Sequence, residues 1–197
     1  MVRRNDQRRA ALTDAAIEAL AERGARGLTF RAVDETAGLP PGTASNYFTD
    51  RDDLLIQTGR RVYERLDPGE EVLREARSGV QDKDKYLALM REVVGRVSGF
   101  RSGSLALLEL RLEATRRPGL RALLTERVRA DVETNVEAHA ASGLPGDAVA
   151  VKLLILTLNW LIVEQLTLPG VYDEEERAQL VEQAVERLVR EPSGGGS

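Results

Sequence analysis

Residues 28–55 read LTFRAVDETAGLPPGTASNYFTDRDDLL, and this run decides the fold. Thr29 is a favoured N-cap residue, so a short helix is predicted to begin after it. Gly38 tolerates a positive φ, which lets the chain turn sharply at the end of that helix. Pro41 suits the first position of a second helix, because its missing N–H costs nothing there. The run therefore predicts two short helices joined by a tight glycine turn.

The second of these helices is predicted to present one apolar and one polar face. Ala44 and Phe48 are four residues apart and so point inward together. The outward positions carry hydroxyls, an amide and a phenol, on Thr43, Ser45, Asn46 and Tyr47. These groups hydrogen-bond phosphates and base edges. With a third helix capped by Asp50, the layout is that of a DNA-binding helix-turn-helix.

Thr29 to Leu55 resembles the N-terminal signature of the tetracycline-repressor (TetR) family of one-component regulators. The shared features are an apolar residue at Val33, the Ala37-Gly38-Leu39 turn, the Gly42-Thr43 pair, Phe48 closing the recognition helix and a basic residue at Arg51. The chain differs where the family usually has tyrosine, alanine and lysine, at Ser45, Asp34 and Arg51 respectively. Tyr47 is expected to make the phosphate contact for which Ser45 is too short. Asp34 is interpreted as orienting either Arg31 or a neighbouring helix end.

Exposure and resemblance together give a set of residues predicted to bind DNA. They are Arg4, Arg8, Thr29, Arg31, Pro41, Gly42, Thr43, Ser45, Asn46, Tyr47 and Arg51. Charge supports the assignment, although the chain as a whole carries −4. Residues 1–31 contain seven arginines against four acids, a net +3 that leaves −7 for the remainder. Such polarisation steers the basic end toward phosphate.

Composition favours an all-α protein of about nine helices. Of the 197 residues, 42% are apolar and 4% aromatic, and none is cysteine, which excludes disulfides and cysteine-based metal or nucleophile chemistry. The helices are predicted at about 5–23, 29–37, 41–48, 50–66, 84–99, 105–117, 120–141, 148–168 and 173–190. The expected organisation is a three-helix DNA-binding head at 1–50, a helical effector-binding and dimerisation body at 51–190, and a flexible tail at 191–197. The N-terminus has no apolar stretch of signal-peptide length, so the expected location is cytoplasmic.

Residues 148–168 are apolar on nearly every face, which predicts burial on nearly every face. A membrane span is the competing interpretation. It is disfavoured because Lys152 and Glu164 bracket a core shorter than the ~20 residues a bilayer requires, with Asn159 inside it. We expect a homodimer through helices 147–168 and 173–190, whose two heads contact half-sites of a palindromic double-stranded operator ~34–36 Å apart. The alternative is that both helices complete a monomeric core.

The family resemblance implies an inducer bound among the middle helices. No cofactor or metal is expected. Candidate lining residues are Tyr86, Met90, Phe100, Leu107, Arg111, Asn159 and Trp160. Trp160 is the first choice, since a buried indole N–H needs a partner. His139 is expected at the surface near a helix end. The ligand is expected to shift helix 50–66 and release DNA, which describes a ligand-released repressor.

Two other functions fit parts of the sequence. Glu109 and Glu113 share a helix face and could act as an acid–base pair, but the chain has one histidine, no phosphate-binding glycine loop and no Gly-x-Ser-x-Gly, so no enzymatic activity is expected. A helical protein-interaction adaptor, using the helix-turn-helix only for packing, is the alternative to a DNA-binding regulator.

Overall fold

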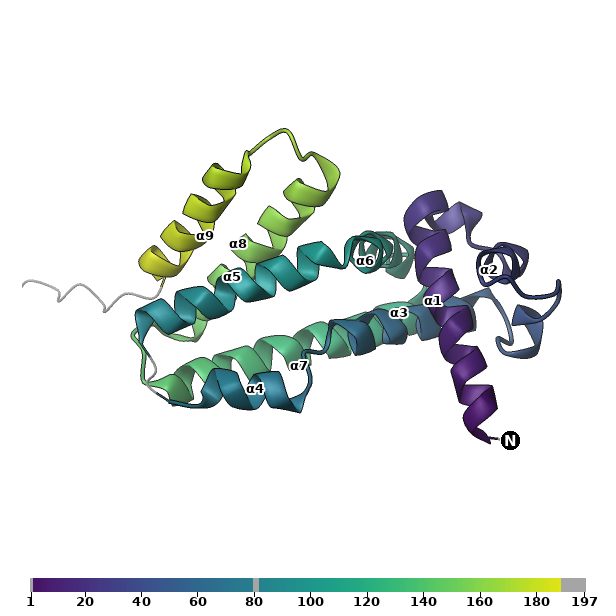
Figure 1. The fold of residues 1–197 in the computed structure, drawn as a ribbon, viewed down its shortest axis with the longest axis horizontal. Helices are drawn as coiled ribbons and strands as arrows, with labels where there is room; N and C mark the ends of the chain where they lie inside the picture. Colours follow the sequence, from purple (N-terminus) through teal and green to yellow (C-terminus); the bar gives the residue numbers. More distant parts are fainter. Residues whose placement is uncertain (1, 80–81, 189–197) are drawn as a thin grey trace, which may run out of the picture. The chain divides into compact units, whose positions relative to one another are not determined.

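A computed structural model describes residues 2–79 and 82–188, apart from the side chains of residues 2–4, 77 and 188. All regular structure in these ranges is helical (Figure 1), as predicted. The helices are α1 (Val2–Gly27), α2 (Phe30–Thr36), the single 3₁₀ turn η1 (Ala44–Asn46), α3 (Arg51–Leu66), α4 (Glu70–Arg77), α5 (Lys83–Gly99), α6 (Arg101–Ala114), α7 (Pro118–Ser142), α8 (Ala148–Thr167) and α9 (Glu174–Leu188). The predicted tail at 191–197 lies outside the described residues.

The chain forms two compact units. The first unit contains residues up to Asp67 together with Phe100–Arg127, and the second contains Pro68–Gly99 together with the chain from Val128 onward. Helix α3 therefore belongs with α1, α2 and α6, because it packs against α1 and α6. The compact units thus do not divide at residue 50, and a DNA-binding function confined to 1–50 stays a prediction.

The core of the first unit forms around α1, which packs against α2, α3 and α6. Leu12, Ile17 and Leu20 lie on one face of α1 and are fully buried with Phe48 and Leu110. This burial of large apolar side chains is the main stabilisation of the unit. The helix breaks at Gly24, as its sequence predicts, where φ is 65° and ψ is 178°.

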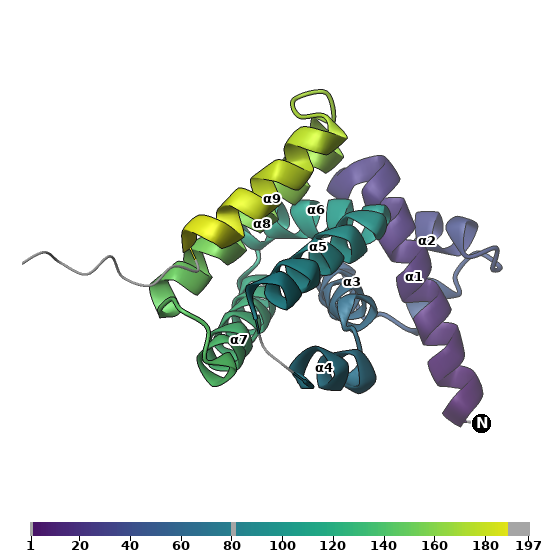
Figure 2. The ribbon, with the colours of Figure 1, turned by 60° about the vertical axis from the view of Figure 1, so that its left-hand side comes forward.

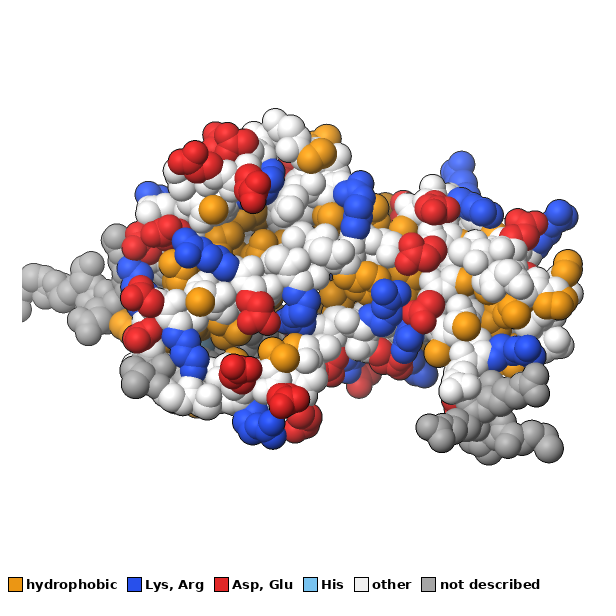
Figure 3. All heavy atoms as spheres, in the orientation of Figure 1, with side chains coloured by type: hydrophobic (Ala, Val, Ile, Leu, Met, Phe, Trp, Pro, Cys, Tyr) orange, Lys and Arg blue, Asp and Glu red, His pale blue; other side chains and the backbone are white. Residues whose placement is uncertain are grey.

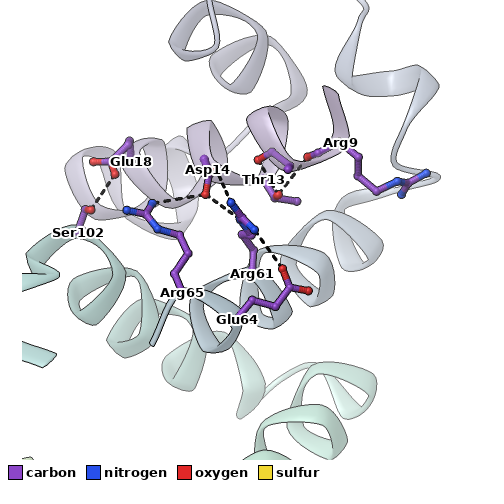
Figure 4. A network of polar contacts seen from close by, with 9 residues as sticks. Arg9, Thr13, Asp14, Glu18, Arg61, Glu64, Arg65 and Ser102 are labelled. Carbon is purple, nitrogen blue, oxygen red and sulfur yellow. Dashed lines mark hydrogen bonds and ion pairs between the residues drawn. The ribbon is translucent and has the colours of Figure 1, made fainter. Parts of the chain in front are cut away.

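Polar contacts join α1, α3 and α6 around that core (Figure 4). Both oxygens of Asp14 accept from Arg61, through Nε and Nη2 at 2.9 Å each. Arg65 adds a longer contact to Asp14 at 3.4 Å, and the Ser102 hydroxyl donates to Glu18 at 2.7 Å. The hydrogen bond to Asp14 raises the pKa of Arg61. A bidentate pair of this kind fixes geometry as well as adding energy, so α1 and α3 are held in one arrangement.

The second unit is built on α5, α8 and α9. Figures 1 and 2 both show α8 and α9 running side by side, with α5 packed against the pair. Leu154 and Leu158 of α8 meet Val185 of α9 in an apolar cluster that includes Met90 of α5. On the surface, ion pairs join α5 to α9, Lys83 with Glu186 at 2.8 Å and Arg91 with Glu182 at 3.0 Å.

Within the described residues the number of α-helices agrees with the prediction, but two of the predicted and observed helices do not correspond. The predicted helix 41–48 is a loop with only the three-residue 3₁₀ turn η1. A helix that was not predicted, α4, occupies residues 70–77 between Gly69 and Ser78. Its acidic first turn, Glu70 and Glu71, complements the helix dipole. The sequence did not predict this helix because the segment is mostly charged and has too few apolar residues to show a helical period.

Helix α8 is not buried on nearly every face, and that expectation was wrong. Leu154, Leu158 and Ile162 are buried. The opposite face exposes an apolar stripe of Val149 (60%), Leu153 (46%), Leu156 (65%) and Trp160 (64%). Within the described residues, α8 is also the one helix long and apolar enough to cross a membrane by length and composition, which is weak evidence because core helices meet the same test. Sequence hydrophobicity alone does not distinguish a face that packs within the chain from one that awaits another partner.

Candidate nucleic-acid interface

Helix α2 is the first element of the predicted helix-turn-helix. The Thr29 hydroxyl accepts from the Ala32 N–H at 3.1 Å, which confirms the predicted N-cap. Gly38 has φ 64° at the turn, the positive φ that the sequence predicts. Beyond the turn, Ala44 and Phe48 are both buried, with the Phe48 ring stacked near Phe30 at 6.5 Å between centroids. The apolar side of the recognition segment is therefore fixed to the core.

Asp34 holds the recognition turn. Its carboxylate is buried, at 2% exposure, and accepts from the Gly42 N–H through Oδ2 and from the Ala44 N–H through Oδ1, both at 2.7 Å. Thr43, the N-cap residue of η1, makes no capping hydrogen bond because its hydroxyl donates to the Pro40 carbonyl. Of the two interpretations of Asp34, the orientation of a neighbouring helix end is the one observed. An acid from α2 thus caps a segment that has no cap of its own.

Arg9, which was not among the predicted interface residues, positions Tyr47. Its Nη1 donates to the Tyr47 carbonyl at 3.2 Å and to Gln57 Oε1 at 2.7 Å. Its guanidinium also lies over the Tyr47 ring, 5.7 Å from the centroid. A cation over an aromatic face is attracted by the ring quadrupole. The sequence offered only a generic signal for Arg9, its place in the arginine-rich N-terminus.

The outer surface of the turn carries most of the predicted contact residues. Pro41, Gly42, Ser45 and Asn46 are exposed, and Thr43 and Tyr47 are half-buried. The Ser45 hydroxyl and the Asn46 amide nitrogen both donate to the Gly42 carbonyl, at 2.8 and 3.1 Å. These short side chains therefore stiffen the turn while their oxygen atoms stay available as acceptors.

Arg31 stands at the exposed face of α2, with 84% of its side chain accessible. Its Nε donates to Glu35 at 2.8 Å, and Arg23 approaches the same carboxylate at 3.8 Å. The hydrogen bond from Arg31 lowers the pKa of Glu35. Figure 3 shows basic and acidic side chains next to each other over α1 and α2. A phosphate group would compete with Glu35 for Arg31 at this surface.

Arg51, predicted to contact DNA, has its guanidinium against the protein backbone. Nη1 donates to the Leu28 carbonyl and Nη2 to the Ala25 carbonyl. On the other side of the same segment, the Glu109 carboxylate accepts from the Ala25 N–H at 2.9 Å. Arg51 and Glu109 therefore brace the chain between the Gly24 break and α2. Contact of Arg51 with DNA stays a prediction.

The remaining predicted DNA contacts lie on α1. Arg8 is exposed. Arg4 lies in the first turns of the helix, and its side chain is outside what the structure describes. All the residues predicted to bind DNA therefore belong to the first unit, on or next to α1, α2, η1 and the start of α3.

The predicted ligand residues divide between the units. Phe100, Leu107 and Arg111 belong to the first unit, where Arg65 packs over the Phe100 ring at 4.0 Å and Arg111 is exposed. Tyr86, Met90, Asn159 and Trp160 belong to the second. Burial of Trp160 was a wrong expectation, since 64% of it is exposed, and Asn159 is exposed as well. These two residues lie on the outer side of α8, away from its core-facing leucines.

His139 and Glu113 also have definite environments. His139 was expected at the surface, but it is 4% exposed and packs edge-on against Tyr86. Glu113 accepts from Arg117 at 2.8 Å and from Arg116 at 2.9 Å, and these hydrogen bonds lower its pKa. Glu109 and Glu113 are therefore occupied with structural partners rather than with each other.

Family models match both parts of the chain. One described as "Bacterial regulatory proteins, tetR family" matches residues 12–58, and one described as "Tetracyclin repressor-like, C-terminal domain" matches residues 81–191. The first covers the Asp34-capped turn, and the second covers most of the second unit.

Individual relatives agree with these models. The HTH-type transcriptional regulator BetI of Rhizobium meliloti (strain 1021) is 30% identical over 84 residues, which are 43% of this chain and 40% of the relative's length. A TetR-family structure from Streptomyces coelicolor A3 (SCO1917) is 27% identical, with a TM-score of 0.69 over 93% of this chain and 98% of the other. The multidrug binding protein EbrR, solved with ethidium, is 26% identical with a TM-score of 0.66, over 93% and 99% of the two chains.

Proposed function

Because the chain belongs to the TetR family of DNA-binding transcriptional regulators, we propose that it is a homodimeric repressor that binds a palindromic operator and is released by a small-molecule effector. The observation that carries the proposal is the buried Asp34 carboxylate capping the turn at Gly42 and Ala44. A recognition surface fixed before it meets DNA loses less conformational entropy on binding.

The proposed DNA contacts follow from the side chains around this turn. Asn46 is the candidate for base edges, and Thr43, Tyr47 and Arg8 are the candidates for phosphates. Arg31 would give up its ion pair with Glu35 and bind a phosphate instead. Each protomer supplies only a short turn, so useful specificity needs two heads on one duplex.

A second copy of the chain is the proposed partner of the apolar stripe on α8. Val149, Leu153, Leu156 and Trp160 recur at intervals of four, three and four residues, so they share one face of the helix. A contiguous exposed apolar surface of this kind marks an interaction site. Leu180 on α9 is exposed too, which supports a bundle of α8 and α9 from two protomers.

The effector proposal rests on the family and on one neighbour. EbrR is a multidrug binding protein solved with ethidium and with imidazole. We propose that the second unit of this chain likewise binds a small molecule and that the liganded state has the lower operator affinity. The linkage requires that the ligand bind the DNA-released state more tightly. A cytoplasmic location and the lack of enzymatic activity belong to the same proposal.

Competitive selection on fragmented genomic DNA, followed by fluorescence anisotropy at two salt concentrations, tests the proposal. A palindromic site bound much more tightly than random duplex is expected, with affinity falling steeply as salt rises. Asn46→Ala should cost ~1–3 kcal/mol on that site if it contacts a base. Full retention of specific affinity in both Asn46→Ala and Tyr47→Ala, or no preference for any fragment, would favour the protein-interaction adaptor.

Sedimentation equilibrium tests the dimer separately. Leu156→Lys places a charge in the middle of the α8 stripe and should yield monomers. Ala130→Lys, at an exposed position of α7, adds the same charge elsewhere and should leave the dimer intact. A wild-type chain that is monomeric at micromolar concentration would refute the homodimer.

A further inference from the structure

His139 lies near the end of α7, inside the second unit, with 4% of its surface exposed. Its ring packs against that of Tyr86 on α5, with centroids 5.4 Å apart and planes at 68°. Tyr86 in turn packs against the apolar cluster that includes Met90 and Leu158. An imidazole and a phenol therefore meet at the edge of an otherwise apolar core.

Neither nitrogen of the His139 ring has a hydrogen-bond partner among the described residues. Tyr86 beside it is half-buried, and its hydroxyl is not one of the buried side-chain atoms that lack a partner. A phenol is protonated at neutral pH, and burial raises the pKa of Tyr86 further. Buried polar groups are nearly always paired, because an unsatisfied one costs the full penalty of its desolvation. The two unpaired nitrogens of His139 therefore call for a hydrogen-bond partner that the described residues do not supply.

None of the described ion pairs includes His139 or Tyr86, so no described ion pair fixes a charge on either ring. The described ion pairs between α5 and α9 are Lys83–Glu186 and Arg91–Glu182, and neither includes His139. A neutral imidazole offers one donor and one acceptor, and a phenol offers both as well. An aromatic hydroxyl group matches this set, since it donates and accepts while its ring suits an apolar surface.

We propose that His139 and Tyr86 form the polar end of a binding site for a neutral, hydroxylated aromatic molecule. The ligand hydroxyl donates to the unprotonated imidazole nitrogen, and the Tyr86 hydroxyl donates to the ligand oxygen. Met90 and its apolar neighbours pack against the ligand ring. This inference rests on the proposed effector response and names the ligand class and the residues that select it.

The first test compares 2-naphthol with naphthalene, which lacks the hydroxyl, by fluorescence titration of the full chain. Wild type is expected to bind 2-naphthol saturably and more tightly than naphthalene. Tyr86→Phe and His139→Phe, which keep an aromatic ring, should each weaken 2-naphthol binding by about 2- to 10-fold, the usual range for one net hydrogen bond. Naphthalene binding should not change. No saturable binding of 2-naphthol to wild type, or equal loss of both probes in the variants, would overturn the proposal.

Thermal unfolding without any probe supplies a second readout. If His139 serves a ligand, His139→Phe removes an unsatisfied polar group and should leave the Tm unchanged or higher. If the imidazole is bonded to buried water for structural reasons, the same variant should lower the Tm, which would contradict a ligand role. Anisotropy with the selected operator separates this inference from the proposed function, because both variants should bind DNA like wild type when no probe is present.

Discussion

Replacement of Asp34 by alanine should weaken operator binding although it removes a negative charge from the DNA-binding unit. The carboxylate accepts two backbone N–H groups at 2.7 Å and is 2% exposed. Hydrogen bonds to a charged group contribute ~1.5–3 kcal/mol each. Part of this is recovered because Gly42 is exposed and its freed N–H reaches water, whereas Ala44 is buried and its N–H is left without an acceptor; the net cost is about 2 kcal/mol.

The cost applies to the conformation that binds DNA. If the ordered turn loses about 2 kcal/mol of stability, a smaller fraction of the protein has the turn in its DNA-binding conformation. The apparent operator affinity then falls by up to about 30-fold. The opposing electrostatic gain is small. One unit charge about 10 Å from a phosphate in water contributes about 0.4 kcal/mol before salt screening. The affinity lost with the capping hydrogen bonds therefore exceeds the affinity gained by removing the negative charge.

Fluorescence anisotropy with the selected operator and with random duplex measures both the loss from capping and the gain from charge. Asp34→Ala should lose affinity for the operator and little for random DNA, while circular dichroism stays close to wild type. Asp6→Ala is the matched control, because it removes the same charge from an exposed position on α1. Operator binding by Asp34→Ala that equals or exceeds wild type would refute the capping argument.

Three further changes probe the elements that support the turn. Arg9→Leu removes the contacts to the Tyr47 carbonyl and ring, and anisotropy should show a loss of about 3- to 10-fold in operator affinity; an unchanged affinity would exclude a positioning role. Glu109→Ala leaves the Ala25 N–H without its acceptor and should lower the free energy of unfolding by ~1 kcal/mol. Calorimetry should show this as a fall in Tm of about 2–4 °C, and an unchanged Tm would contradict a structural role for Glu109. The pKa of Glu113 is lowered, so the stabilisation by its carboxylate is present at neutral pH and is lost as pH falls through that pKa. Glu113→Gln should therefore lower the Tm at pH 7, and the Tm difference from wild type should narrow below about pH 4. A Tm difference that stays constant with pH would show that the charge is irrelevant.

Sequence was sufficient for features set by local chemistry. The N-caps at Thr29 and Asp50, the break at Gly24 and the positive φ at Gly38 all depend on residues within one helical turn. The inward direction of Phe48 followed from a four-residue spacing. Each of these requires no knowledge of what lies beyond the segment.

Features that depend on distant partners were missed or left undecided. Asp34 bonds to backbone eight and ten residues away, so the sequence left open whether it orients Arg31 or a neighbouring helix end. Trp160 was expected to be buried because α8 is apolar, yet hydrophobicity does not tell which chain covers a face. His139 was placed at the surface from its position near a helix end, and only its packing against Tyr86 reveals burial.

The recognition turn illustrates how a weak local structure becomes a specific surface. Three residues of 3₁₀ helix have too few internal hydrogen bonds to hold one conformation alone. Here the turn is fixed from α2 by Asp34, from α1 by Arg9, and from the core by Phe48. Because α1 is itself joined to α3 through Asp14 and Arg61, a displacement of α3 would carry these supports together and move the turn without remodelling it. An effector acting on such a unit would change where the recognition surface lies, while its shape and its base preference stay the same.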